Sequence, residues 1–289
     1  TGTLYPIFVE AFSDATVGVG RPFFDRMAIP LSFLLLLAMG IGPIAPYRTA
    51  SAKVVWERIR WPFRTALGAA ALAVLFGYRN PFLLLGILTA IFVMSVNIRH
   101  LYVTAATSAA KLEIGWAQAA SRVLRGDPHY WGGQISHLGI AILALGIAFS
   151  SNLSETATVS IDAGDSATFA GFELTFEQAF SREEPGRFVT GALISVTKNG
   201  SEVGTYEPRL NNYSNNTSPI ATPAVDTMPS GDLYLSLRSI NADKVVLEMF
   251  WVPFIWLIWV GGFLAGVAGI WAYTAKKPER VEREERSGV

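Results

Sequence analysis

The chain has 289 residues, of which 51% are hydrophobic and only 16% are charged, and its mean hydropathy is +0.35. This balance is typical of a membrane protein with a polar portion. The formal net charge is zero, so no nucleic-acid partner is expected. The absence of cysteine excludes disulfides, thiol chemistry and cysteine-based metal sites, and three histidines are too few for a multi-histidine metal centre.

The first residues resemble the end of a hydrophobic segment. Residues 1–9 lack an initiator Met and the basic start of a signal peptide, and we interpret them as the end of a truncated transmembrane helix. We therefore expect the chain to be part of a longer protein, either a truncation or the product of a split gene. Residues 10–26 are polar and contain glycine, and we predict a periplasmic connector there.

Residues 27–150 are predicted to be transmembrane helices with basic cytoplasmic loops. The predicted spans are residues 27–45, a short Ala-rich run at 65–77, residues 82–97 and residues 132–149. The basic loops are residues 48–64 and 98–125, and the first part of the second loop is open to continuing the preceding helix.

Residues 151–248 change character, because short runs of alternating hydrophobic and polar residues replace the long apolar segments. Turn clusters at Lys198–Ser201 and Asn211–Asn216 separate these runs. We predict a small all-β domain, either a barrel of the OB type or a sandwich. A last span at 251–274, introduced by Trp251, and a charged tail at 275–289 follow.

The fold class predicted is an integral membrane α-helical bundle of about five transmembrane helices with an inserted small all-β domain. Lys and Arg are concentrated in the two basic loops and the tail, which the positive-inside rule places in the cytoplasm. The β domain is then periplasmic, and the expected location is a bacterial inner membrane or an organellar inner membrane.

His137 is the one ionisable residue inside the span at 132–149. Steps of three and four residues from it reach Gly133, Ala141, Ala144 and Ala148, so the histidine lies on a stripe of small residues. One interpretation is close packing against another helix, with a hydrogen bond from the imidazole. The other is a porphyrin lying along the stripe, with His137 as an axial ligand of the iron. The pattern leaves both open, whereas His100 and His129 are interpreted as solvent or headgroup histidines.

Several stretches, in order along the chain, resemble the CcmF-type cytochrome c haem lyases of the CcmF/CcsA haem-handling family. They are Gly2–Pro6, Val17–Asp25, Met39–Pro43, Tyr130–Gly133 followed by His137–Gly139, Asp232–Tyr234 and Trp251–Gly262. The resemblance implies that His137 is an axial ligand to the iron of a resident haem b, with Gly133 and Ala141 allowing close approach of the haem.

The same resemblance implies a role in attaching haem covalently to apocytochrome c outside the membrane. The implied partners are the upstream half of the same protein or a split subunit, a haem chaperone, other cytochrome c maturation proteins, apocytochrome c and membrane lipid. Family members are about twice this long and carry a Trp-rich haem-handling segment and a second ligand that this chain lacks. The chain alone is therefore expected to be an incomplete enzyme. The alternative is a membrane transporter or assembly scaffold without a redox centre, in which His137 packs or relays protons.

Overall fold

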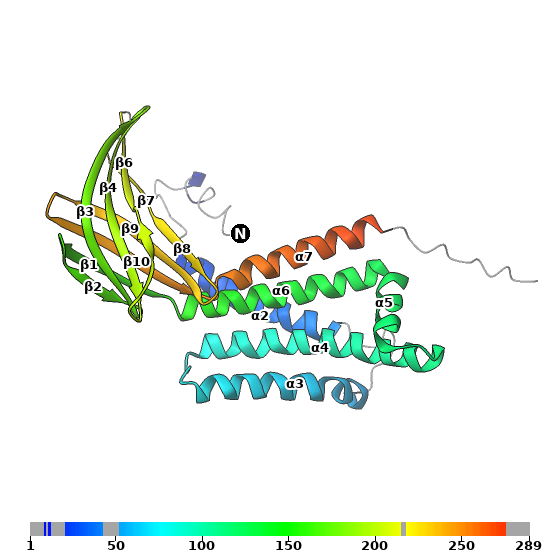
Figure 1. Ribbon diagram of the computed structural model, residues 1–289. Helices are drawn as coiled ribbons and strands as arrows, with labels where there is room; N and C mark the ends of the chain where they lie inside the picture. The colour runs from blue at the N-terminus through cyan, green and yellow to red at the C-terminus, as the bar shows by residue number, and fades with distance from the viewer. Residues whose placement is uncertain (1–8, 10, 13–20, 43–51, 215–217, 276–289) are drawn as a thin grey trace, which may run out of the picture. The chain divides into compact units, whose positions relative to one another are not determined.

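The computed structural model describes residues 9, 11–12, 21–42, 52–214 and 218–275. Two compact units are formed, one by residues 1–145 together with 258–289 and one by residues 146–257. Figure 1 shows the helices of the first unit and the strands of the second. The predictions for residues 1–9 and for the tail at 275–289 lie almost wholly outside the described residues.

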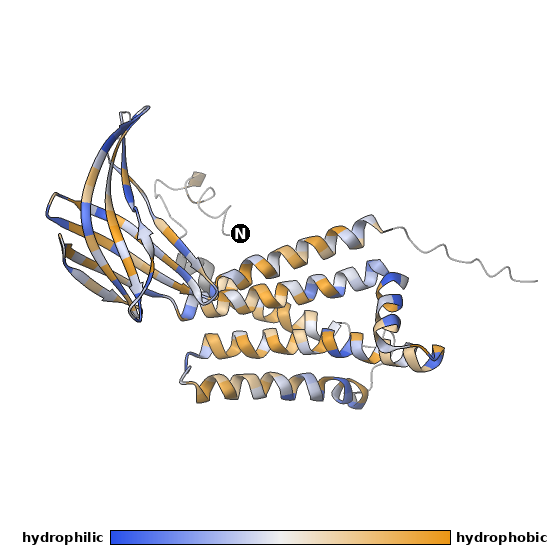
Figure 2. Cartoon of the chain, viewed as in Figure 1, coloured by the Kyte–Doolittle hydropathy of each residue, from blue (hydrophilic) through white to orange (hydrophobic). Residues whose placement is uncertain are grey.

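The first unit is helical. Its elements are α2 (Arg21–Ile41), α3 (Ala52–Leu75), α4 (Pro81–Leu112), α5 (Trp116–Gly126), α6 (Pro128–Asn152) and α7 (Trp256–Thr274). In Figure 1, α3, α4 and α6 lie side by side and α5 crosses one end of this group. Figure 2 shows hydrophobic residues along α4, α6 and α7 and hydrophilic residues gathered near α5.

Helix α4 has a clear start and a clear end. Asn80 caps it, because its Oδ1 accepts hydrogen bonds from the backbone N–H groups of Phe82 (2.9 Å) and Leu83 (3.3 Å), and Pro81 occupies the first helical position. The helix ends at Glu113, whose φ of 54° is left-handed. It therefore continues well past residue 97, and the region predicted as the second basic loop is helix α4 followed by the strongly amphipathic α5.

Among the described residues, three helices are long and apolar enough to cross a membrane: α4, α6 and α7. Residues 26–41 of α2 form a shorter apolar helix. Residues 65–75 of the predicted run form the second half of α3, whose first half carries Lys53, Arg58 and Arg60 of the first basic loop. The membrane helical part is thus confirmed, and the count of five spans stays a prediction. Helix α2 already begins at Arg21, so the predicted connector ends earlier than residue 26.

The second unit is a β-sandwich. One sheet has the strand order β1-β10-β9-β8, and the other has the order β2-β3-β4-β6-β7 with β5 also paired to β4. The strands are β1 (Glu155–Asp162), β2 (Ser166–Phe169), β3 (Phe172–Glu184), β4 (Arg187–Lys198), β5 (Ser201–Tyr206), β6 (Arg209–Tyr213), β7 (Ile220–Thr222), β8 (Ala224–Met228), β9 (Gly231–Ile240) and β10 (Lys244–Pro253). The predicted all-β domain is confirmed, and of the two predicted forms it is the sandwich.

The core of the sandwich follows from alternation along the strands. Over part of each of β3, β9 and β10, buried side chains alternate with more exposed ones, because successive residues of a strand point to opposite faces. The buried sets are Phe172, Leu174 and Phe176; Leu233, Leu235 and Leu237; and Val245, Leu247 and Met249. The turn predicted at Lys198–Ser201 joins β4 to β5 through Asn199 and Gly200, both with positive φ.

Two boundaries of the β-sandwich differ from the prediction. Strand β10 runs to Pro253, with Trp251 opposite Glu155 of β1, so Trp251 belongs to the sandwich and α7 begins only at Trp256. Composition alone places these hydrophobic residues in the span, because an apolar strand and an apolar helix entry have the same composition. Asn211, predicted in a turn, lies in β6, where its buried amide Nδ2 donates to Thr222 Oγ1 at 2.7 Å.

Candidate functional site

His137 lies well inside α6. The helix begins at Pro128, where Asp127 Oδ1 accepts a hydrogen bond from the backbone N–H of Tyr130 at 3.1 Å. His137 is nine helical steps from Pro128, which is a rise of about 14 Å. His137 therefore lies further from the start of its helix than the predicted start at Gly132 implies. The helix is long and apolar enough to cross a membrane.

The imidazole of His137 is half-buried, and its Nδ1 is buried without a hydrogen-bond partner. A buried polar atom of this kind needs an explanation, because a missing hydrogen bond costs about 1–3 kcal/mol. A neutral imidazole has one N–H donor and one acceptor nitrogen. If Nδ1 carries the proton and finds an acceptor, Nε2 remains for a ligand.

Two further polar side chains near His137 are buried and lack a partner. Gln134 precedes His137 by three residues on α6, so the two lie on neighbouring positions of the same face, and its Oε1 is unpaired. Asn97 on α4 donates through Nδ2 to Val93 O at 2.9 Å but leaves its Oδ1 unpaired. Both side chains are at most 8% exposed.

Two contacts between α4 and α6 show which part of α6 lies opposite Asn97. Val93 on α4 packs in one cluster with Ala141 on α6. His100, seven residues further along α4, stacks on Trp131 at 5.2 Å between ring centroids. Because α6 runs the opposite way between these contacts, Asn97 lies level with the turn that carries Gln134 and His137. Neither unpaired oxygen is hydrogen-bonded to the imidazole, and both are candidate acceptors for its N–H.

The predicted stripe of small residues divides into two parts. Ala141 is fully buried against Leu36 of α2 and Val93 of α4, and Ala144 packs against the same cluster. This part has the contacts that the helix-packing interpretation predicts. Gly133, one turn before His137, is different, since a Cβ built there would meet nothing within 4 Å. Room beside the histidine is thus on the Gly133 side.

Helix α7 packs on the opposite face of α6, away from His137. A Cβ at Gly139 would lie 2.5 Å from Ala265 N, and one at Gly132 would lie 2.6 Å from Ala272 Cβ. Ser136 Oγ, between these glycines, donates a hydrogen bond to Ala265 O at 2.6 Å. Small residues that allow such close approach are typical of helix pairs in membranes.

The contact between α6 and α7 forms a second seam of small residues, which was not predicted. The available signal was the small-residue spacing Gly132, Ser136 and Gly139 on α6, matched by Gly261 and Ala265 on α7. This spacing lies on the other side of α6 from His137 and its small-residue stripe.

His100, predicted to be a solvent or headgroup histidine, has defined contacts within the helical unit. Its Nε2 is hydrogen-bonded to the hydroxyl of Tyr130 at 2.8 Å, and its ring stacks on Trp131. Both partners come from the first turns of α6. His129 also lies there, with a buried Nε2 that has no partner.

Residues 152–253 match the family model described as the CcmF C-terminal beta-sandwich. A cytochrome c-type biogenesis protein CcmF of Pseudomonas fluorescens is 30% identical over 97% of this chain and 42% of its own length. A protein with the same description from Pseudomonas aeruginosa is 28% identical over 93% of the chain and 40% of its own length. The resemblance to the CcmF family is confirmed. This chain spans about two-fifths of the length of these CcmF relatives.

A solved structure described as Cytochrome c Heme Lyase CcmF shares the fold. The TM-score is 0.72 at 22% sequence identity, with 95% of this chain and 42% of the other chain covered. The CcmF fold therefore includes both the helical part and the β-sandwich described above.

Proposed function

We propose that this chain works in cytochrome c biogenesis as the part of a CcmF-type haem lyase that supplies one axial ligand, His137, to a haem b. The observation that carries the proposal is a half-buried histidine at membrane depth with a buried Nδ1 that has no partner. The relatives described as cytochrome c-type biogenesis proteins support the wider role. Haem attachment to apocytochrome c, outside the membrane, is proposed for the assembly with the upstream half and the maturation partners, including a haem chaperone.

The residues around His137 fit a haem in part. Within the described ranges no three His, Asp or Glu side chains gather, so the site offers one histidine and not a cage of ligands. Gly133 leaves space on one side of the histidine, whereas the face at Ala141 is taken by α2 and α4. We therefore keep Gly133 as the position of close haem approach and place Ala141 among the helix contacts that hold α6.

The chain's own residues would hold the imidazole in one orientation. The buried oxygens of Asn97 and Gln134 have no partner, so either would be an acceptor for the Nδ1–H of His137 once haem binds, which would fix the tautomer and leave Nε2 for the iron. Helix α6 is itself fixed between α7 on one face and α2 and α4 on the other, so the imidazole has a rigid support. When bound, the haem supplies one-electron chemistry, for which burial and axial ligation set the potential.

A second candidate function, a transporter or scaffold without a redox centre, is favoured by one observation. Ala141 and Ala144 are packed against neighbouring helices, as expected if the stripe serves only assembly. Under this alternative the buried polar atoms of His137, Gln134 and Asn97 bind water or relay protons.

The test uses the chain assembled with its upstream half and purified in detergent. The spectrum of the dithionite-reduced complex is compared for wild type, His137→Ala and the matched control His129→Ala, which removes a histidine from the same helix. We expect a low-spin haem b spectrum that is lost or becomes high-spin only in His137→Ala. Added imidazole should restore the spectrum in His137→Gly. An unchanged low-spin spectrum in His137→Ala would remove the ligand assignment and favour the scaffold.

A further inference from the structure

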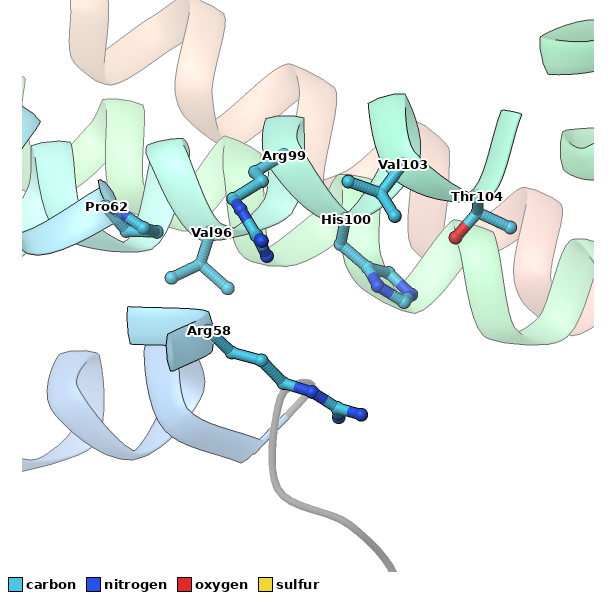
Figure 3. A pocket seen from close by; sticks show the side chains of 7 residues that line it. All are labelled: Arg58, Pro62, Val96, Arg99, His100, Val103 and Thr104. Carbon is cyan, nitrogen blue, oxygen red and sulfur yellow. The ribbon is translucent and has the colours of Figure 1, made fainter. Parts of the chain in front are cut away.

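A cationic cavity lies between α3 and α4, apart from the His137 site. It has a volume of about 300 Å³ and is shown in Figure 3. Arg58 from α3 and Arg99 and His100 from α4 supply its polar lining, and the Arg99 and His100 side chains point to the side on which Arg58 lies. Pro62, Val96 and Val103 supply an apolar lining. The lining of one cavity thus combines two guanidinium groups with a hydrophobic wall.

The position of the cavity along α4 matches the edge of a bilayer. From Pro81 to Arg99 the helix contains no charged residue, and these eighteen steps rise about 27 Å, close to the thickness of a hydrocarbon core. Arg99 is the first charged side chain beyond this stretch. The cavity therefore opens where the apolar part of the helix gives way to its polar part.

Exposed aromatic side chains lie at the same height along α3 and α4 as the cavity. Trp56 and Trp61 on α3 are 59% and 54% exposed, and Tyr102 on α4 is 59% exposed. Trp and Tyr concentrate where a membrane meets water, because one end of each ring is apolar and the other is polar. These residues mark the level of Arg58 and Arg99 as interfacial, independently of the length of α4.

A second cavity continues from the first along α4. It shares Val103 and Thr104 with the first cavity and extends past Thr107 and Ser108 to Lys111. The lining therefore changes from apolar at Val96 to hydroxyl-bearing and cationic at Lys111. This is the order of groups met along a phospholipid, from acyl chain through phosphate to polar headgroup.

We propose that the cavity formed by Arg58, Arg99 and His100 binds the phosphate of an anionic phospholipid, with an acyl chain along Pro62 and Val96. Guanidinium groups bind phosphate oxygens through paired hydrogen bonds. His100, held by Tyr130, adds a ring nitrogen at the cavity wall and links the lipid to the first turn of α6. The site uses no part of the haem-ligand proposal, so either can fail alone.

The test is native mass spectrometry of the full chain in detergent, with phosphatidylglycerol, phosphatidylcholine or inorganic phosphate added. We expect retention of phosphatidylglycerol well above phosphatidylcholine, with a loss of about fivefold in affinity for each of Arg58→Gln and Arg99→Gln. Arg60→Gln is the matched control, because it removes the same charge from α3 two residues away, on another side of the helix. It should bind phosphatidylglycerol like wild type.

Three outcomes would overturn the proposal. Equal retention of the two lipids would show that the cavity does not select charge. An equal loss in Arg60→Gln would show that only the general charge of α3 matters. Full displacement of phosphatidylglycerol by millimolar inorganic phosphate would identify the occupant as a free anion. Circular dichroism of each variant separates loss of lipid from loss of fold.

Discussion

The contact between α6 and α7 can be tested by adding one methyl group at two glycines of the same helix. At Gly139 a new Cβ would lie 2.5 Å from Ala265 N, about 1 Å inside ordinary van der Waals contact. At Gly133 a new Cβ meets nothing within 4 Å. Both substitutions bring the same gain in helix propensity, about 1 kcal/mol from replacing Gly by Ala. Their difference therefore isolates the clash with α7.

The two substitutions are expected to change the stability of the chain in opposite directions. Forcing a methyl group into a packed contact typically costs about 1–3 kcal/mol. Gly139→Ala should therefore be destabilised relative to Gly133→Ala by about that amount, and Gly133→Ala should be at least as stable as wild type. Because the obstacle at Gly139 is the backbone of Ala265, a change of side-chain rotamer cannot relieve it.

The assay is unfolding of the purified chain in mixed micelles at increasing mole fractions of sodium dodecyl sulfate, followed by circular dichroism and Trp fluorescence. The midpoint should fall for Gly139→Ala and hold or rise for Gly133→Ala. Gly139→Ser should also fall, which excludes an effect peculiar to one residue. Identical midpoints for the two alanine variants would refute the close contact between α6 and α7.

Three further predictions concern the β-sandwich and the topology. A fragment of residues 152–253 should give a β-rich circular dichroism spectrum and unfold cooperatively. A fragment of residues 152–248 should be strongly destabilised, because it loses half of β10. Equal unfolding midpoints of the two fragments in urea would count against the observed end of β10. Single cysteines introduced at Ser201 and Ser51 should differ in their labelling by an impermeant thiol reagent in intact spheroplasts. The reagent should label Ser201→Cys and spare Ser51→Cys. The reverse pattern would show that the proposed topology is inverted. Burial raises the pKa of Tyr206 from 10.0 to about 12, and the neighbouring Asp226 carboxylate adds to the shift. The contribution of this tyrosine to stability is therefore complete below pH 10 and is lost as the pH rises towards 12. The stability of Tyr206→Phe should depend less on pH over that interval, and parallel curves for the two proteins would contradict the assignment.

Composition and periodicity were enough to predict the helical part and the all-β domain. Long apolar runs and two-residue alternation are local signals, and α4, α6, β3 and β9 follow them directly. The end of the sandwich was missed because Trp251 is assigned to a strand by its partner Glu155, which is nearly a hundred residues away in the sequence. No local pattern contains that pairing.

The histidine site could be predicted only in part for the same reason. The face that His137 shares with Gly133 and Ala141 follows from helical spacing alone. Whether a neighbour covers that face depends on which helix packs there, and α2 and α4 cover Ala141 while leaving Gly133 open. The unpaired oxygen of Asn97 likewise becomes relevant only through the alignment of α4 with α6.

The pairing of β1 with β10 has a consequence for how the protein folds. Roughly a hundred residues separate α6 from α7, and bringing the ends of a flexible loop of that length together costs about 4 kcal/mol in chain entropy. Because Glu155 and Trp251 are paired on adjacent strands, a folded sandwich holds its two ends one strand apart, about 4.8 Å. Once the sandwich has formed, α6 and α7 behave as a hairpin with a short connection, although they are distant in sequence. Mutations in the sandwich core should therefore slow the association of α6 with α7, even though they touch neither helix.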